Sequence, residues 1–298
     1  MAIILGLAET VLKEGLIYGI MAMGVYITYK ILNFPDLSVD GTFPLGACVA
    51  AATITAGINP FIACLLATLA GAFAGCVTGL LHVKLQITDL LSGILVMTAM
   101  WSVNLLITGG TAIKQFFNKP TIFNVALYSK LPKSVYAHRQ LIIIFIIAVL
   151  VKLLLDWYLA TKNGLLLRAS GNNEQYVTNL GINPGTMKIL GLSIGNACTA
   201  LAGCVLAQLN ENADINSGKG MVVMALASVI IGTAVFKRVK FIKLVTMAIL
   251  GSILYKLCLM VALQLGLPNN YLKLLMAVLL TVAIVSERMG MKGGSNGK

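Results

Sequence analysis

Acidic and hydroxyl side chains interrupt a strongly apolar sequence at residues 33–41, which read Asn-Phe-Pro-Asp-Leu-Ser-Val-Asp-Gly. Pro35 disfavours helical geometry at the residue before it, so a helix is expected to break here. Broken helices can present polar groups to a solute path through a helical bundle. The residues that would line such a path are Asn33, Asp36, Ser38 and Asp40. The alternative is an ordinary loop in which Asp40 or Thr42 caps the next helix.

A second segment, residues 210–218, repeats Asn, Asp and Gly in a similar order and adds Asn210 and Asp214 to the candidate path residues. In the topology expected below, the two segments lie on opposite sides of the membrane, which is what an inverted repeat with discontinuous helices would give. Chance similarity of two short segments is the alternative. Lys256 is a further candidate, because a lysine inside an apolar run either faces a polar interior or partner, or extends to the membrane surface.

The sequence contains none of the common motifs for catalysis or for binding a nucleotide or a metal. Gly218-Lys219 is followed by Gly220 rather than Ser or Thr, so the phosphate-binding loop Gly-x-x-x-x-Gly-Lys-[Ser/Thr] is missing. Neither a Gly-x-Ser-x-Gly turn nor a His-Glu-x-x-His helix occurs. The six cysteines form no Cys-x-x-Cys pair. We therefore expect a protein that is not an enzyme, with no catalytic residue, metal or cofactor on this chain.

Composition places the chain in a lipid bilayer. Apolar residues make up 58% and charged residues 11% of the sequence, whereas soluble domains carry about a quarter charged residues. A spanning helix needs roughly 20 apolar residues, so we expect a single all-α polytopic domain, residues 1–298, with about nine transmembrane helices and a range of eight to ten. Gly71, Gly75 and Gly79 would let one span approach another closely, within the chain or in a homodimer. The expected spans are 13–32, 41–57, 60–82, 88–109, 139–160, 187–209, 220–236, 241–264 and 268–286.

Basic residues indicate the orientation of these spans. The connections on one side hold 13 Lys and Arg residues and those on the other side hold eight, and the richer side is expected to be cytoplasmic. This places segment 161–188 in the cytoplasm and the 110–138 loop outside. The net charge of +12 fits basic loops against anionic lipid. No aromatic-rich basic soluble module is present, which argues against nucleic-acid binding.

Residues 168–182 predict a short helix between two spans. Asn173 can cap its N-terminus, and Glu174 in the first turn is favoured by the helix dipole. Gly181 can end the helix in a left-handed conformation, and Pro184 prevents its continuation. A two-turn helix cannot bury a core of its own, so this helix is expected to need a partner surface.

The same segment resembles the coupling segment of ABC importer permeases of the branched-chain amino acid and ribose permease superfamily. The family pattern is Arg-Ala-x-Gly-x-Asn-x-x-Ala-Ala-x-x-x-Gly-Ile, and the residues that match it are Arg168, Ala169, Gly171, Asn173, Gly181 and Ile182. Tyr176 and Val177 replace the usual Ala pair. Residues 29–46 resemble a second family block, which is similar to the Pro-Asp-Leu-Thr-Val-Asp-Gly stretch of a subgroup linked to tryptophan- or tyrosine-type uptake operons. The resemblance covers residues 10–285.

The resemblance implies the membrane subunit of an ATP-driven importer in a bacterial cell membrane. ATPase subunits, which would carry ATP and Mg, are expected to dock on Arg168, Gly171, Asn173, Glu174, Tyr176, Leu180 and Gly181. Tyr176 and Leu180 share one helix face, which would enter the ATPase. An external solute-binding lipoprotein and a second permease, most simply another copy in a homodimer, would complete the assembly.

The solute implied by the resemblance is an amino acid, with an aromatic one indicated by the subgroup. A sugar or a nucleoside is the alternative within the superfamily. The competing class is an ion-coupled secondary transporter, in which Asp36, Asp40, Asp214 or Lys256 would couple the ion.

Overall fold

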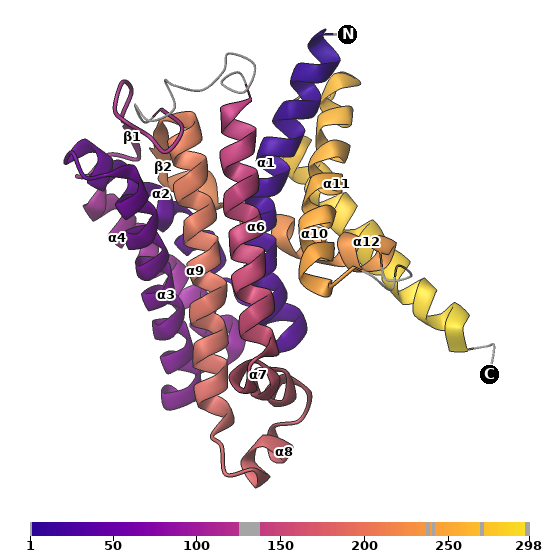
Figure 1. The fold of residues 1–298 in the computed structure, drawn as a ribbon. Coiled ribbons are helices and arrows are strands. Elements are labelled where there is room, and N and C mark those ends of the chain that lie inside the picture. The colour runs from indigo at the N-terminus through magenta and orange to yellow at the C-terminus, as the bar shows by residue number, and fades with distance from the viewer. Residues whose placement is uncertain (1, 125–137, 237–238, 240–241, 269–270, 296–298) are drawn as a thin grey trace.

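The computed structural model describes residues 2–124, 138–236, 239, 242–268 and 271–295, which form a bundle of long helices (Figure 1). The helices are α1 (Ala2–Tyr26), η1 (Ile27–Ile31), α2 (Val39–Thr55), α3 (Pro60–Leu85), α4 (Asp89–Ile107), α6 (Arg139–Ala160), α7 (Lys162–Asn172), α8 (Glu174–Asn179), α9 (Pro184–Asn210), η3 (Ile215–Gly218), α10 (Met221–Phe236), α11 (Leu244–Gln264) and α12 (Leu272–Ser295). The strands are β1 (Ile113–Gln115) and β2 (Asn212–Asp214).

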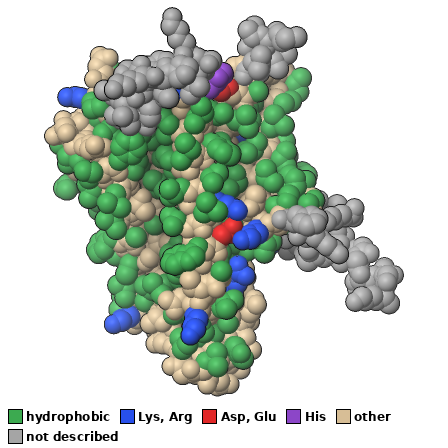
Figure 2. All heavy atoms as spheres, viewed as in Figure 1, with side chains coloured by type: hydrophobic (Ala, Val, Ile, Leu, Met, Phe, Trp, Pro, Cys, Tyr) green, Lys and Arg blue, Asp and Glu red, His purple; other side chains and the backbone are tan. Residues whose placement is uncertain are grey.

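The polytopic helical architecture predicted from the sequence is confirmed. A helix covers each of the nine expected spans, the first being α1 continued by η1. Seven helical stretches of the described residues are long and apolar enough to cross a membrane, while α2 and Leu274–Val285 are shorter apolar helices. Hydrophobic side chains cover most of the face in Figure 2, and most lysines and arginines visible there lie toward the end that carries α7 and α8. This distribution fits a bundle surrounded by lipid.

The two ends of the bundle carry different structures (Figure 1). At one end, here called the sheet end, β1 pairs antiparallel with β2 and places Ile113 opposite Asp214. At the other end, here called the α8 end, α8 projects beyond the long helices and α7 packs beside the start of α9. β1 belongs to the 110–138 loop, of which residues 125–137 lie outside the described part. The strand pair was not expected, because strands of three residues leave no alternating pattern to detect.

Helices α3 and α9 begin with the same local signal. The Asn59 side chain accepts a hydrogen bond from the Phe61 N–H at 2.9 Å, and the Asn183 side chain accepts one from the Gly185 N–H at 2.8 Å. A proline follows each asparagine at the first helical position, where it has no N–H to leave unbonded. Both ends are therefore specified by residues next to them in the chain.

The glycines spaced by four on α3 form a seam against α9. A Cβ at Gly71 would lie 2.5 Å from the Asn196 carbonyl oxygen, and one at Gly75 would overlap the Leu192 carbonyl oxygen. A Cβ at Gly79 would lie 2.8 Å from the Cα of residue 189. The two helices thus run antiparallel and their backbones touch between residues 71–79 of α3 and 189–200 of α9. Of the two alternatives, packing within the chain is the one that the structure shows.

The predicted helix break after the first span is present. η1 ends at Ile31, and α2 begins only at Val39. The suggestion that Asp40 or Thr42 caps α2 was wrong: Ser38 occupies the cap position, and its hydroxyl donates to the Asp36 carboxylate instead of capping the helix. α2 leads toward the sheet end, whereas α10 starts beside α2 and runs the other way.

Candidate functional site

The predicted short helix is α8, at the extreme end of the molecule (Figure 1). The Asn173 side chain accepts a hydrogen bond from the Tyr176 N–H at 3.2 Å, which confirms it as the N-cap. Gly181 has a φ of +76°, the left-handed conformation expected for the helix stop. Pro184 then begins α9. The local signals in the sequence therefore specified this helix correctly.

One face of α8 is free and the other is attached to the bundle. Tyr176 and Leu180 are 57% and 53% exposed, whereas Val177 between them is fully buried. Arg168, on α7, is also exposed. An exposed tyrosine and leucine one turn apart form a small apolar surface that a partner protein could cover.

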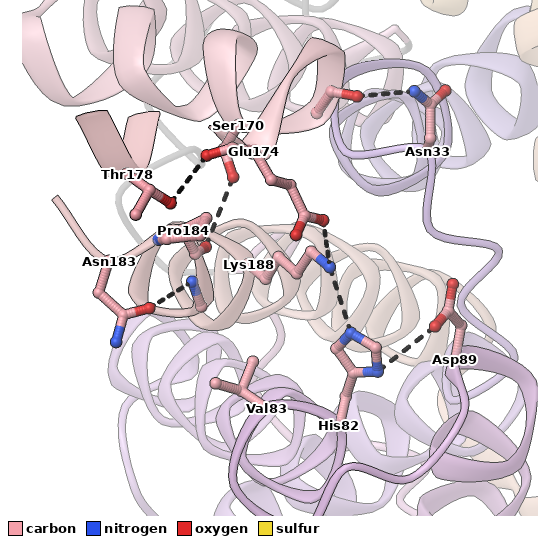
Figure 3. Close-up of polar contacts among 12 residues, drawn as sticks. Asn33, His82, Val83, Asp89, Ser170, Glu174, Thr178, Asn183, Pro184 and Lys188 are labelled. Atoms are coloured by element: carbon pink, nitrogen blue, oxygen red, sulfur yellow. Dashed lines mark hydrogen bonds and ion pairs between the residues drawn. The ribbon is translucent and has the colours of Figure 1, made fainter. Parts of the chain in front are cut away.

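A chain of polar contacts ties α8 to three other helices (Figure 3). Glu174 forms an ion pair with Lys188 of α9 at 2.7 Å, and the Lys188 ammonium lies 3.4 Å from Nε2 of His82 on α3. His82 Nδ1 lies 3.3 Å from the Asp89 carboxylate at the start of α4. These side chains line a cavity of about 560 Å³ beside α8. A displacement of α8 would therefore disturb the contacts between α3, α4 and α9 as well.

Gly171 and Asn33 lie together where η1 ends. A Cβ at Gly171 would overlap the Ile31 carbonyl oxygen, so only glycine allows α7 to pack this closely. The Asn33 amide donates to the Gly171 carbonyl at 2.9 Å (Figure 3). The structure thus brings Asn33 to the α7–α8 segment and not to Asp36. Gly171 contacts η1 rather than contributing to the free surface of α8.

Asp36 and Ser38 belong to a buried network in the interior of the bundle. Both are at most 4% exposed. Asp36 accepts hydrogen bonds from the Ser38 hydroxyl at 2.6 Å and from the Asn196 amide at 2.7 Å. The Asn196 amide oxygen accepts in turn from the Thr42 hydroxyl at 2.7 Å. In this conformation both oxygens of the Asp36 carboxylate accept hydrogen bonds from the protein.

Asp40 joins the two segments that share the Asn, Asp and Gly order. Its carboxylate accepts from the Gly220 N–H at 3.1 Å and from the Val222 N–H at 2.8 Å, at the N-terminus of α10. A negative charge is favourable at this position because the helix dipole is positive there. A Cβ at Gly218 would overlap the Asp40 carbonyl oxygen, so the backbones also touch. The two segments are therefore in direct contact.

The three remaining path candidates lie elsewhere. Asn210 is exposed at the end of α9, and Asp214 ends β2, where its carboxylate accepts from the Asn216 N–H at 2.8 Å. Both are at the sheet end and apart from Asp36. Lys256 forms an ion pair with Glu14 of α1 and lies 4.6 Å above the Tyr18 ring. Of the two alternatives for Lys256, a polar partner is the one observed.

A second cavity, of about 270 Å³, lies where α2, α4 and η3 meet. Asn104 is fully buried in its wall; its amide donates to the Gly41 carbonyl at 3.1 Å, but its amide oxygen has no partner among the described residues. The residues around the cavity combine charged, polar and aromatic side chains: Asp40, Gly41, Pro44, Met97, Thr98, Trp101, Asn104, Ile215 and Lys219.

Sequence reasoning missed Asn196, Glu14 and Asn104. Each is a strongly polar side chain within an expected span, and such residues usually face a polar interior or partner, which is the signal that could have identified them. In the described part of the chain, no three His, Cys, Asp or Glu side chains gather as they would around a metal ion.

Comparison with known proteins gives a family match and two informative relatives. Residues 7–285 match the family described as the permease component of branched-chain amino acid transport systems. The chain is 41% identical to a tyrosine transport system permease protein of Clostridioides difficile (strain R20291), over 94% of this chain and 91% of that protein. It is 25% identical to the ribose import permease protein of Escherichia coli (strain K12), over 74% of this chain and 67% of that protein. No solved structure matches.

Proposed function

Because the chain belongs to the permease family of branched-chain amino acid transport systems, a family of membrane subunits in ABC transporters, we propose that it imports an aromatic amino acid, tyrosine being the first candidate. The observation that carries the proposal is the nearly full-length similarity to a tyrosine transport system permease. The import is driven by ATP that separate ATPase subunits hydrolyse.

The ATPase docks on the free face of α8. Val177 and the Glu174–Lys188 ion pair hold α8 to the bundle, so the exposed Tyr176 and Leu180 side chains face away from it. A docked ATPase that moved α8 would pull on α9 through Lys188 and on α3 through His82. This arrangement supports a coupling role for α8, while Gly171 and Asn33 fasten the segment to η1.

We expect Tyr176→Ala to abolish ATP-driven uptake and weaken co-purification with the ATPase, because it removes about half of an apolar docking surface. The variant should insert and melt like the parent, since Tyr176 is exposed. Phe145→Ala, which truncates a comparably exposed aromatic side chain on α6, is the matched control. Normal solute-stimulated ATPase activity in Tyr176→Ala would exclude this docking surface.

The α8 end faces the cytoplasm and the sheet end faces outward, where a solute-binding lipoprotein delivers tyrosine to a pair of permease copies. Asn173 and Asn118 are both exposed, near opposite ends of the molecule. In a cysteine-free background, Asn118→Cys should react with an impermeant thiol reagent on intact cells, and Asn173→Cys should react only after the cells are opened. The reverse pattern would contradict the orientation.

The decisive experiment is uptake by the permease reconstituted in vesicles with its cognate ATPase and binding lipoprotein. We expect labelled tyrosine to enter only with ATP inside and binding protein outside. Uptake driven by an ion gradient without ATP would instead favour the ion-coupled class. Ribose is tested in parallel, because the similarity to a ribose import permease favours a sugar as the second candidate.

A further inference from the structure

The cavity between α2, α4 and η3 has the size and wall of a site for one small molecule. Its volume is about 270 Å³, close to the lower end of the roughly 300–1,000 Å³ usual for ligand pockets. It lies where the two Asn, Asp and Gly segments meet. The cavity therefore lies at the contact between α2 and η3, which form two of its walls, and α4 forms the third.

Asn104 supplies an acceptor that the protein leaves without a donor. Its side chain is fully buried, and its amide oxygen has no hydrogen-bond partner among the described residues. Burying an acceptor without a partner destabilises a folded protein, so such atoms are rare unless a ligand or water satisfies them. Because Asn104 lines the cavity, a bound molecule that donates a hydrogen bond would satisfy it.

Two opposite charges border the same cavity. The Asp40 carboxylate accepts two backbone N–H groups but keeps further lone pairs. Lys219 is exposed, and no ion pair or hydrogen bond of its ammonium group is found within the described part of the chain. Charged side chains of membrane proteins face a polar interior or a water-filled cavity, because contact with lipid is costly. A water-filled path beside this cavity would account for the exposed Lys219 ammonium group here.

The third component of the wall is aromatic. Trp101 of α4 is 51% exposed and lines the cavity together with Met97 and Pro44. An indole with one free face offers a stacking surface for another aromatic ring. A carboxylate, an ammonium group and an indole around one small cavity match the three parts of an aromatic amino acid.

We propose that this cavity is a solute subsite in the permease itself, which binds an aromatic amino acid as a zwitterion. The α-ammonium group of the solute donates to Asp40 and to the amide oxygen of Asn104. Its α-carboxylate pairs with Lys219, and its ring packs on Trp101. The solute class rests on the proposed function, whereas the location of the subsite rests on the geometry.

The chain contains only two tryptophans, Trp101 and Trp157, which makes the subsite directly observable. Trp157 is 70% exposed on α6 and does not line the cavity. In Trp157→Phe the fluorescence reports on Trp101 alone, and in Trp101→Phe it reports on Trp157 alone. Phenylalanine is the probe, because it does not absorb where tryptophan is excited.

In the purified permease without its ATPase, phenylalanine should change the Trp101 fluorescence saturably and leave the Trp157 fluorescence unchanged. Phenethylamine, which lacks the carboxylate, and phenylpropionate, which lacks the amine, should each bind at least tenfold more weakly. Equal binding of all three compounds would overturn the zwitterion assignment. A response of neither tryptophan, combined with full transport by Trp101→Ala, would overturn the subsite.

Transport separates this proposal from the proposed function. We expect Trp101→Ala to lower tyrosine uptake about tenfold, the loss of one aromatic contact, while Trp157→Ala transports normally. Both variants should retain ATPase binding. If the reconstituted system imports ribose and no amino acid, the proposed function fails. In that case, a loss of ribose uptake in Trp101→Ala would still support the cavity as the solute site. Normal ribose uptake by Trp101→Ala would overturn the subsite.

Discussion

The buried network around Asn196 can be tested by exchanging the side chains of Asp36 and Asn196. In Asp36→Asn, the retained oxygen still accepts from Ser38, so the new NH₂ group either faces the NH₂ group of Asn196 across 2.7 Å or forces that amide to turn over and give up its bond to the Leu192 carbonyl. The charge-assisted bond is lost, and we expect a destabilisation of about 2–3 kcal/mol. In Asn196→Asp, two carboxylates meet at the same place, which costs about 4 kcal/mol at an effective dielectric constant near 20.

The double variant should recover most of this loss. The new amide at position 36 can donate to the new carboxylate at position 196, which can still accept from the Thr42 hydroxyl, while the Ser38 hydroxyl stays on the oxygen at position 36. Only the 3.0 Å bond from Asn196 to the Leu192 carbonyl is lost. We therefore expect the free energy of unfolding of the double variant to lie within about 1–2 kcal/mol of that of the parent. The difference between this loss and the sum of the two single losses is then far above the ~0.5 kcal/mol seen for independent sites.

The assay is thermal unfolding of the parent, both single variants and the double variant, purified in the same detergent. A double variant whose melting temperature falls by the sum of the two single effects would refute the network. Uptake by the double variant then separates stability from mechanism. If it is stable but transports poorly, the position of the charge matters during transport, as expected of a path residue.

Two further predictions concern helix contacts. Gly46→Ala should prevent correct assembly, because its Cβ would overlap the Ala200 carbonyl oxygen, whereas Gly6→Ala, which has open space around it, should be neutral in yield and melting temperature. Glu14→Gln or Lys256→Met should each lower the free energy of unfolding by about 1–3 kcal/mol, because each leaves a partly buried charge without its partner. The double variant removes both charges and should melt closer to the parent. Equal falls in melting temperature in all three variants would contradict this.

The elements that the sequence predicted well are those specified by neighbouring residues. Long apolar runs located the spans, because a bilayer demands a continuous apolar length. Asn173, Gly181 and Pro184 specified α8, because caps and stops act over one helical turn. The glycine spacing on α3 predicted close packing but left its partner open, since the partner lies far away in the chain.

The elements that it did not predict depend on contacts between distant segments. The pattern at residues 33–41 suggested one group of path residues, but the chain passes from the α8 end into the interior there. Asn33 therefore meets Gly171, Asp36 meets Asn196, and Asp40 meets the start of α10. Which of these contacts each residue makes is fixed by the packing of α9 and α10, and no local spacing encodes it.

The glycine seam between α3 and α9 has a consequence for how the protein is made. α3 leaves the ribosome long before α9, so its glycine face must first lie against lipid or another early helix. Insertion of the spans and their final packing are then separate stages, as in the two-stage description of membrane protein folding. A nascent chain that ends before α9 would lack the backbone that fills the groove at Gly71 and Gly75. Quality control in the membrane would therefore meet an unfinished surface until translation has passed residue 210.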